Sequence, residues 1–312
     1  MGEDLAATRV LVATVMVNLG LAGIVGAWAS MLWLRRAASP WAAVARRRSW
    51  SALKAALAFA VIADGLLLWL QAAYMGQVPL SDAITMLPSI ALQTYVGRSW
   101  SAGVLGLLLV VLAASGSGAP GTGLRLAGAA IGISIFVFAR AAVSHAGDAG
   151  LGSLPLLVEG AHLWAISLWL GVVGIAAWAV LADGAAVALV DRSDMARWVQ
   201  TLSSVATGAL AVVIGSGPFN AWRGIASAAN LIGSAYGTTL VVKVALVLIA
   251  FALGGFNRLQ AMPRLLTALR APADHSSLPR RFVQVLRIEA VVLFAALMAA
   301  ALLSSSPLPT AT

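Results

Sequence analysis

The sequence predicts an all-α, polytopic membrane protein, a bundle of about eight transmembrane helices. Apolar residues make up 61% of the 312 positions and charged residues only 10%, and the mean hydropathy is +0.94. A soluble domain could not cover so much apolar surface. A bilayer core about 30 Å thick needs roughly 20 apolar residues per helix, and stretches of that length recur along the whole chain. We therefore expect a single transmembrane domain over residues 1–312.

Each predicted helix is an apolar stretch bounded by charged residues, Pro or Gly. The predicted spans are 8–34, 52–74, 89–115, 124–143, 155–181, 198–217, 238–256 and 282–305. The first stretch is longer than a signal-peptide core and no small-residue cleavage site follows it, so we expect a retained helix. Small residues should let some of these helices approach closely. They are Gly20, Gly23, Gly26, Gly171 and Gly174.

Basic residues are concentrated in two predicted loops. They are Arg35, Arg36, Arg46, Arg47, Arg48 and Lys54 in the first, and Arg258, Arg264, Arg270, Arg280 and Arg281 in the second. By the positive-inside rule both loops are cytoplasmic. Both termini and the loops 75–88, 144–154 and 218–237 then face outward. This topology explains the net charge of +9 without a nucleic acid partner, and no nucleotide-binding motif is present.

Ionisable groups within a bilayer are costly, so they usually pair with one another or serve a function. Most of those in the predicted spans lie toward the outer ends. They are Asp64, Arg140, Glu159, His162 and Lys243. We expect Asp64 to pair with Lys243, and Arg140 to pair with Glu159, as structural or gating groups, and Glu289 to be a further group of this kind. The inner half is nearly without polar groups apart from Glu289, Asn257 and residues near the basic loops.

Two histidines and a carboxylate form a candidate metal site. His145 directly follows the fourth predicted span and His162 lies about two turns inside the fifth, while Glu159 shares a helical face with His162. Imidazole suits copper or zinc, and the absence of cysteine excludes thiolate sites. Antiparallel fourth and fifth helices would bring the three side chains together. The alternative is structural, with His162 bonded to Glu159 in the core and His145 capping a helix end.

Methionine thioethers could add soft ligands for Cu(I). Met75 and Met86 bracket the outer loop after the second span, and Met16 should lie in the outer half of the first. Packing is the alternative role for each of them.

Short motifs along nearly the whole chain resemble the CopD family of copper-resistance membrane proteins. The motifs are Thr94-x-x-Gly97-x-x-Trp100, Ser144-His145-Ala146, His162 with Trp169-Leu170-Gly171, Gly217-Pro218-Phe219-Asn220-Ala221-Trp222, Tyr236-Gly237 with Lys243, Asn257-Arg258 and Leu286-Arg287-Ile288-Glu289. Their order along the chain, more than any one of them, carries the resemblance.

The resemblance implies an eight-helix inner-membrane protein that moves copper across the membrane, usually described as inward. It also implies a soluble periplasmic partner of the CopC type, which for this chain would be a separate protein. His145 and His162 are the family residues carried over, and Glu159 is added from its spacing. Copper, as Cu(I) or Cu(II), is the expected cargo, and we expect a copper-homeostasis protein rather than an enzyme.

Two other functions use the same residues. His145 and His162 could be axial ligands of haem b, or form a membrane copper enzyme with Glu159. The chain could also be a docking or assembly factor that binds copper without transporting it. Absorbance of the purified protein separates haem from copper, and vesicle transport assays separate a carrier from a docking factor.

Overall fold

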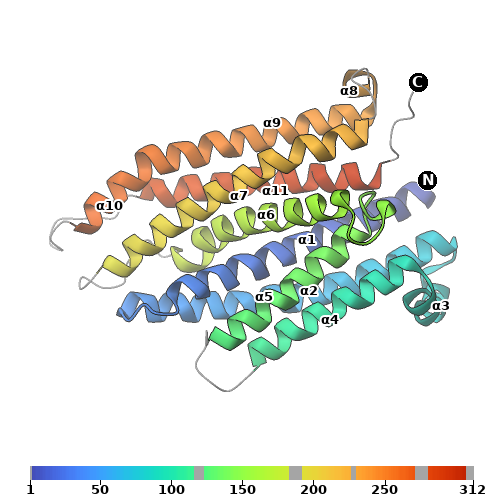
Figure 1. Cartoon of the computed structure of the whole chain (residues 1–312), viewed down its shortest axis with the longest axis horizontal. Coiled ribbons are helices and arrows are strands. Elements are labelled where there is room, and N and C mark those ends of the chain that lie inside the picture. The colour runs from blue at the N-terminus through green and yellow to red at the C-terminus, as the bar shows by residue number, and fades with distance from the viewer. Residues whose placement is uncertain (1, 116–122, 183–191, 226–229, 271–279, 307–312) are drawn as a thin grey trace.

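The computed structural model describes residues 2–115, 123–182, 192–225, 230–270 and 280–306, and all regular elements in these ranges are helical (Figure 1). Eight helical segments are long and apolar enough to cross a membrane. They are α1 (Gly2–Leu34), α2 (Pro40–Gly76), α4 (Tyr95–Ser115), α5 (Gly123–Ala142), α6 (Leu154–Ile175), α7 (Ser193–Ile225), α9 (Ala235–Phe256) and α11 (Arg280–Ser305). The predicted all-α, multi-pass fold is therefore confirmed.

Shorter elements connect or extend these helices. They are α3 (Leu80–Gln93), a 3-10 turn η1 (Gly147–Ala149), α8 (Asn230–Gly233), α10 (Met262–Arg270), and two π-helical segments, η2 (Ala176–Val180) and η3 (Asn257–Ala261). The π-helical segments extend α6 and α9, so the spans that contain these two helices reach Val180 and Arg270.

The third predicted span begins too early, because residues 80–93 form the separate helix α3. The break lies at Thr94, whose extended backbone ends α3 while its hydroxyl accepts a hydrogen bond from the Gly97 amide at 2.9 Å. Gly97 is required there, because a Cβ at this position would overlap the Ile90 carbonyl. The outer loop predicted at 75–88 is consequently mostly helical.

The outer loop predicted at 218–237 also begins too early, because α7 passes through Pro218 and continues to Ile225. A proline within a helix removes one backbone hydrogen bond and crowds the preceding turn, so it often ends a helix. In this protein the helix continues, as membrane helices often do where neighbouring groups compensate. The extra two turns carry Asn220 and Arg223 along the wall of a cavity.

Helix α1 lies at the centre of the bundle and contributes to two hydrophobic cores. One core lies among α1, α2, α4 and α5, and the other among α1, α6, α7 and α11. Glycines allow α1 to approach its neighbours as predicted: a Cβ on Gly20 would lie 2.8 Å from that of Ala60, and one on Gly26 would overlap the Gly171 backbone. Gly174 plays no such part, since its nearest neighbour is a Trp178 ring carbon at 3.9 Å.

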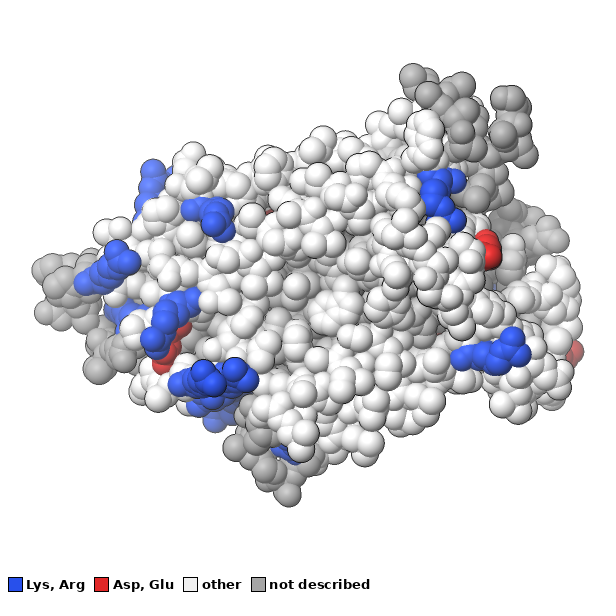
Figure 2. Space-filling view, viewed as in Figure 1, with Lys and Arg blue, Asp and Glu red and all other residues white. Residues whose placement is uncertain are grey.

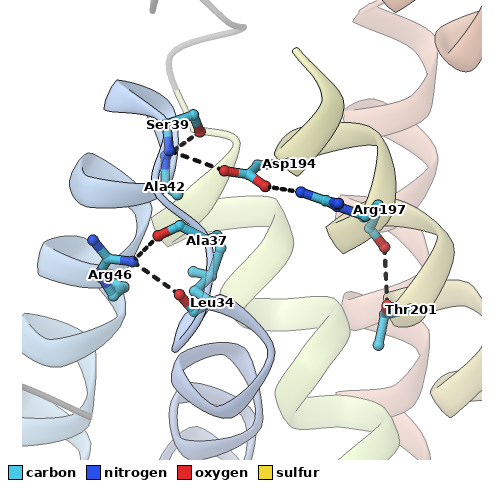
Figure 3. Close-up of polar contacts among 8 residues, drawn as sticks. All are labelled: Leu34, Ala37, Ser39, Ala42, Arg46, Asp194, Arg197 and Thr201. Carbon is cyan, nitrogen blue, oxygen red and sulfur yellow. Dashed lines mark hydrogen bonds and ion pairs between the residues drawn. The ribbon is translucent and has the colours of Figure 1, made fainter. Parts of the chain in front are cut away.

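The turn between α1 and α2 is joined to the start of α7 by polar contacts (Figure 3). Ser39 caps α2 by accepting from the Ala42 amide, and its own amide donates to the buried Asp194 carboxylate at 3.0 Å. Arg197 also donates to Asp194. Arg46 donates to the carbonyl of Leu34, the last residue of α1, and to that of Ala37 in the turn. This network fixes one end of the bundle.

The two ends of the bundle differ in charge. The start of α1, the end of α11, η1 and α3 lie at one end, and the start of α2 and α10 lie at the other (Figure 1). Lys and Arg side chains gather at the α10 end on the face shown in Figure 2. We call the α1-start end the outer end; that it faces the periplasm stays a prediction of the positive-inside rule.

Candidate functional site

A cavity of about 630 Å³ opens among α6, α7, α9 and α11 toward the outer end; we call it the outer cavity. Most of its lining is apolar, and its polar residues come from five separate segments. They are Ser144, His145, Asp148, Glu159, His162, Asn220, Arg223, Tyr236, Lys243 and Ser304. All three predicted metal ligands with nitrogen or oxygen donors therefore line one cavity.

His162 is oriented by a residue of the next transmembrane helix. Its Nδ1 lies 2.8 Å from the Ser216 hydroxyl oxygen, and that hydroxyl lies 2.6 Å from the Val212 carbonyl oxygen. A hydroxyl has a single hydrogen, which the Val212 carbonyl can only accept. The imidazole Nδ1–H is therefore the donor to Ser216, and Nε2 retains its lone pair. A histidine whose other nitrogen donates to the protein in this way is prepared to bind a metal.

Glu159 lies one turn before His162 and is held from α7 as well. One carboxylate oxygen, Oε2, accepts a hydrogen bond from the Asn220 side chain at 2.7 Å. Lys243 and Arg223 are its electrostatic partners, which corrects the expected pairing with Arg140. The structure also gives no direct hydrogen bond between Glu159 and His162, the contact on which the structural alternative depended; their partners are Asn220 and Ser216.

His145 occupies the exposed edge of the outer cavity. Its side chain is 51% exposed and its Nδ1 lies 4.0 Å from a carboxylate oxygen of Asp148. Ser144 shapes this turn by accepting from the Ala146 amide. Among the described residues, no three His, Asp or Glu side chains lie close enough to hold a metal together. His145, Glu159 and His162 line one cavity. That they bind one metal ion together stays a prediction.

Asp64 and Arg140 lie together in a different part of the bundle. They line a small pocket among α2, α4 and α5 with Gln71 and Trp100, and Arg140 is the electrostatic partner of the buried Asp64. The expected pair of Asp64 with Lys243 is therefore wrong. Within the described ranges, Asp64 Oδ1, Arg140 Nε and Trp100 Nε1 have no hydrogen-bond partner. A bridging water would satisfy such atoms.

The three methionines lie away from the outer cavity lining. Met75 is 58% exposed at the end of α2. Met86, on α3, packs near Gly76, and Met16 packs against the core shared by α1 and α2. Their part in copper binding stays a prediction, and their observed contacts are those of packing residues.

A second cavity of about 250 Å³ lies among the same four helices nearer the basic end; we call it the inner cavity. Glu289 lines it and is only 2% exposed. Its Oε1 accepts a hydrogen bond from the Trp169 indole at 2.9 Å. Asn257 and Arg258 also line this cavity.

Sequence reasoning missed the residues that orient the candidate ligands. Ser216, Asn220 and Arg223 all lie on the part of α7 near Pro218. The signal was present for Asn220, which falls inside the motif Gly217 to Trp222. Its contact with Glu159 spans 61 positions, so spacing along the chain could not reveal it.

Comparison with known families agrees with this picture. Residues 196–303 match the family model of CopD, copper resistance protein D. This segment covers most of α7, all of α9 and most of α11, and it includes Lys243 and Glu289 but neither candidate histidine ligand. No curated protein and no solved structure matches the chain. The resemblance to the CopD family seen in the sequence motifs is therefore confirmed over residues 196–303, where the chain is similar to copper resistance protein D.

Proposed function

We propose that this protein captures copper at the outer cavity and carries it through the bacterial inner membrane, as a homeostasis protein and not an enzyme. The observation that carries the proposal is the orientation of His162, whose Nδ1–H is engaged by Ser216 so that Nε2 keeps a lone pair in a membrane protein similar to copper resistance protein D. Copper is the cargo of the protein in this role, and the outer cavity is where it is first held.

Glu159 is the second ligand in the proposed site. Asn220 holds one of its carboxylate oxygens, so the other can approach a cation without losing the orientation of the side chain. Lys243 supplies the positive charge that balances Glu159 when no metal is bound. An incoming copper ion would replace this interaction, since an unpaired carboxylate within a membrane is costly.

His145 is the proposed entry ligand. It is exposed at the edge of the cavity, so a soluble donor can reach it without entering the bundle. A CopC-like periplasmic protein, as the family resemblance implies, would present copper to His145, from which the ion would move to His162 and Glu159. Imidazole and carboxylate donors accommodate Cu(II), and imidazole also binds Cu(I).

The test is copper binding by the purified full-length protein. Wild type should retain copper after gel filtration, and His162→Ala should lose the copper bound at the outer cavity at an unchanged elution volume. Leu157→Ala is the matched control, because Leu157 is an exposed residue of the same helix. Equal copper in wild type and His162→Ala would contradict the proposed site. A haem absorbance band in the wild type would instead support the redox alternative.

Transport is tested separately in sealed vesicles. Copper added outside should accumulate in vesicles containing the wild type and not in those containing His162→Ala at equal protein content. Binding by the purified wild type without accumulation, when a CopC-like donor is supplied, would favour the docking function.

A further inference from the structure

The outer and inner cavities are lined by the same four helices, α6, α7, α9 and α11, at different positions along each helix. Helix α6 contributes His162 to the outer cavity and Trp169 to the inner one, and α11 contributes Ala300 and then Glu289. Seven residues of helix correspond to about 10 Å and eleven residues to about 16 Å. The inner cavity therefore lies roughly two to three turns deeper along one route through the bundle.

Apolar side chains separate the two cavities. Val213 and Val247 line the inward part of the outer cavity, and Leu210 and Phe251 line the inner cavity on the same two helices. Leu210 and Val213 are both buried. A cation on this route would cross one short apolar segment.

Glu289 is an unusual residue for this depth. It lies more than two turns into α11, which begins at Arg280, and its side chain is 2% exposed. The group that donates a hydrogen bond to it is a neutral indole, that of Trp169. The basic residue of the cavity lining, Arg258, donates instead to the hydroxyls of Ser203 and Thr207 on α7. A carboxylate in this environment is stabilised by a proton or by a bound cation.

Asn257 supplies an independent observation that points to the same ligand. Its side chain is 4% exposed and lines the inner cavity. Its amide nitrogen donates to the Phe282 carbonyl at 3.4 Å, whereas its Oδ1 has no hydrogen-bond partner among the described residues. A buried oxygen without a donor is costly. The cavity therefore presents an unsatisfied amide oxygen and a carboxylate.

We propose that the inner cavity is a second cation site, in which the Glu289 carboxylate and the Asn257 Oδ1 bind a cation through oxygen. That this cation comes from the outer cavity rests on the proposed function. Amide and carboxylate oxygens bind hard or borderline cations, which include Cu(II), and they bind Cu(I) poorly. A proton taken up by the Glu289 carboxylate itself is the alternative. Two spectroscopic measurements distinguish whether Cu(II) or a proton binds at this site.

Two adjacent glycines provide a matched pair of variants for this site. A Cβ on Gly254 would lie 3.1 Å from Glu289 Oε1, whereas a Cβ on Gly255 would meet no atom within 4 Å. Both substitutions to alanine have the same intrinsic effect on helix α9. Only Gly254→Ala should disturb the carboxylate.

The copper arm uses Cu(II) alone as the probe. In a background of His145→Ala and His162→Ala, the purified protein should show a Cu(II) electron paramagnetic resonance signal without nitrogen hyperfine splitting. Adding Glu289→Gln should abolish this signal, Gly254→Ala should weaken it, and Gly255→Ala should leave it unchanged. Melting temperatures of all variants check that each is folded.

The proton arm uses infrared spectroscopy of the wild type without copper. A carboxylic acid band that titrates with pH and disappears in Glu289→Gln identifies the proton as the bound cation. The inference is overturned if folded Glu289→Gln changes neither the Cu(II) signal nor the infrared spectrum. Failure of the proposed function is distinguishable, because it appears as unchanged copper binding in His162→Ala with Glu289 intact.

Discussion

The imidazole of His162 is held 2.8 Å from the hydroxyl of Ser216, which is itself bonded to the Val212 carbonyl. This relay joins α6 to α7 across 54 positions and fixes which ring nitrogen carries the proton. The candidate ligand is thereby oriented before copper arrives, which reduces the ordering that binding requires.

Replacing Ser216 with alanine should weaken copper binding without removing a ligand. Loss of an outer hydrogen bond to a metal-binding histidine typically costs about 10–100-fold in affinity. Ser216→Thr should retain binding, because a threonine hydroxyl can form the same bond to the carbonyl four residues earlier. Competition titration with a copper chelator measures both variants. Unchanged affinity in Ser216→Ala would show that the relay does not orient a ligand.

Lys243 should compete with copper for Glu159. Lys243→Met removes the positive charge that acts on both Glu159 and His162, so copper affinity should rise by at least a few-fold, as like charges repel within a medium of low dielectric constant. The copper-free variant should melt at a lower temperature, because Glu159 loses its partner. Lys54→Met, at an exposed position of α2, is the control. Weaker copper binding in Lys243→Met would assign the lysine a supporting role instead.

The membrane fold was predictable because a bilayer imposes a simple rule on composition. Helices such as 124–143 and 282–305 are visible as apolar stretches with charged or glycine-rich borders, and the structure places them within two residues of these limits. The rule fails where polar and apolar residues mix. Residues 80–88 contain Ser81, Asp82 and Pro88, so they resemble a loop although they belong to α3.

Which polar groups meet within the bundle was not predictable in the same way. Depth places Asp64, Arg140, Glu159 and Lys243 at similar levels, and either pairing neutralises all four charges. The choice depends on the order of helices around α1, which puts Arg140 in the small pocket with Asp64 and Lys243 in the outer cavity with Glu159. The position of a residue within its span gives its depth in the membrane, whereas the packing of the whole chain decides which helices are neighbours.

Replacing Asp64 or Arg140 alone should destabilise the protein more than replacing both. Asp64 is buried and Arg140 partly buried in the small pocket of α2, α4 and α5, so Asp64→Asn would leave a guanidinium within the bundle without its counter-charge, a change of about 3–5 kcal/mol in comparable buried pairs. The double variant Asp64→Asn, Arg140→Gln should recover much of the loss. Thermal unfolding in detergent compares the three proteins. A single variant as stable as the double would show that the two charges do not depend on each other.

The contact between α1 and α6 should tolerate no side chain at Gly171. A Cβ there would overlap the Ala22 carbonyl, whereas one on Gly174, a turn later, would come no nearer than 3.9 Å to its neighbours. Gly171→Ala should therefore lower stability by about 1–3 kcal/mol, the usual effect of overpacking. Gly174→Ala should be neutral or stabilising. The reverse order of melting temperatures would contradict the observed packing of α1 on α6.

The orientation of the bundle can be tested at its two ends with single cysteines, since the chain has no native cysteine. Leu151 is 80% exposed beside η1 at the outer end, and Gln260 is exposed in η3 near the basic end. The positive-inside rule places the arginines near Gln260 in the cytoplasm. In intact spheroplasts, Leu151→Cys should therefore react with a membrane-impermeant thiol reagent, and Gln260→Cys should react only after the membrane is opened. Labelling of Gln260→Cys alone in intact spheroplasts would reverse the topology, and the outer cavity with His145 and His162 would then take copper from the cytoplasm.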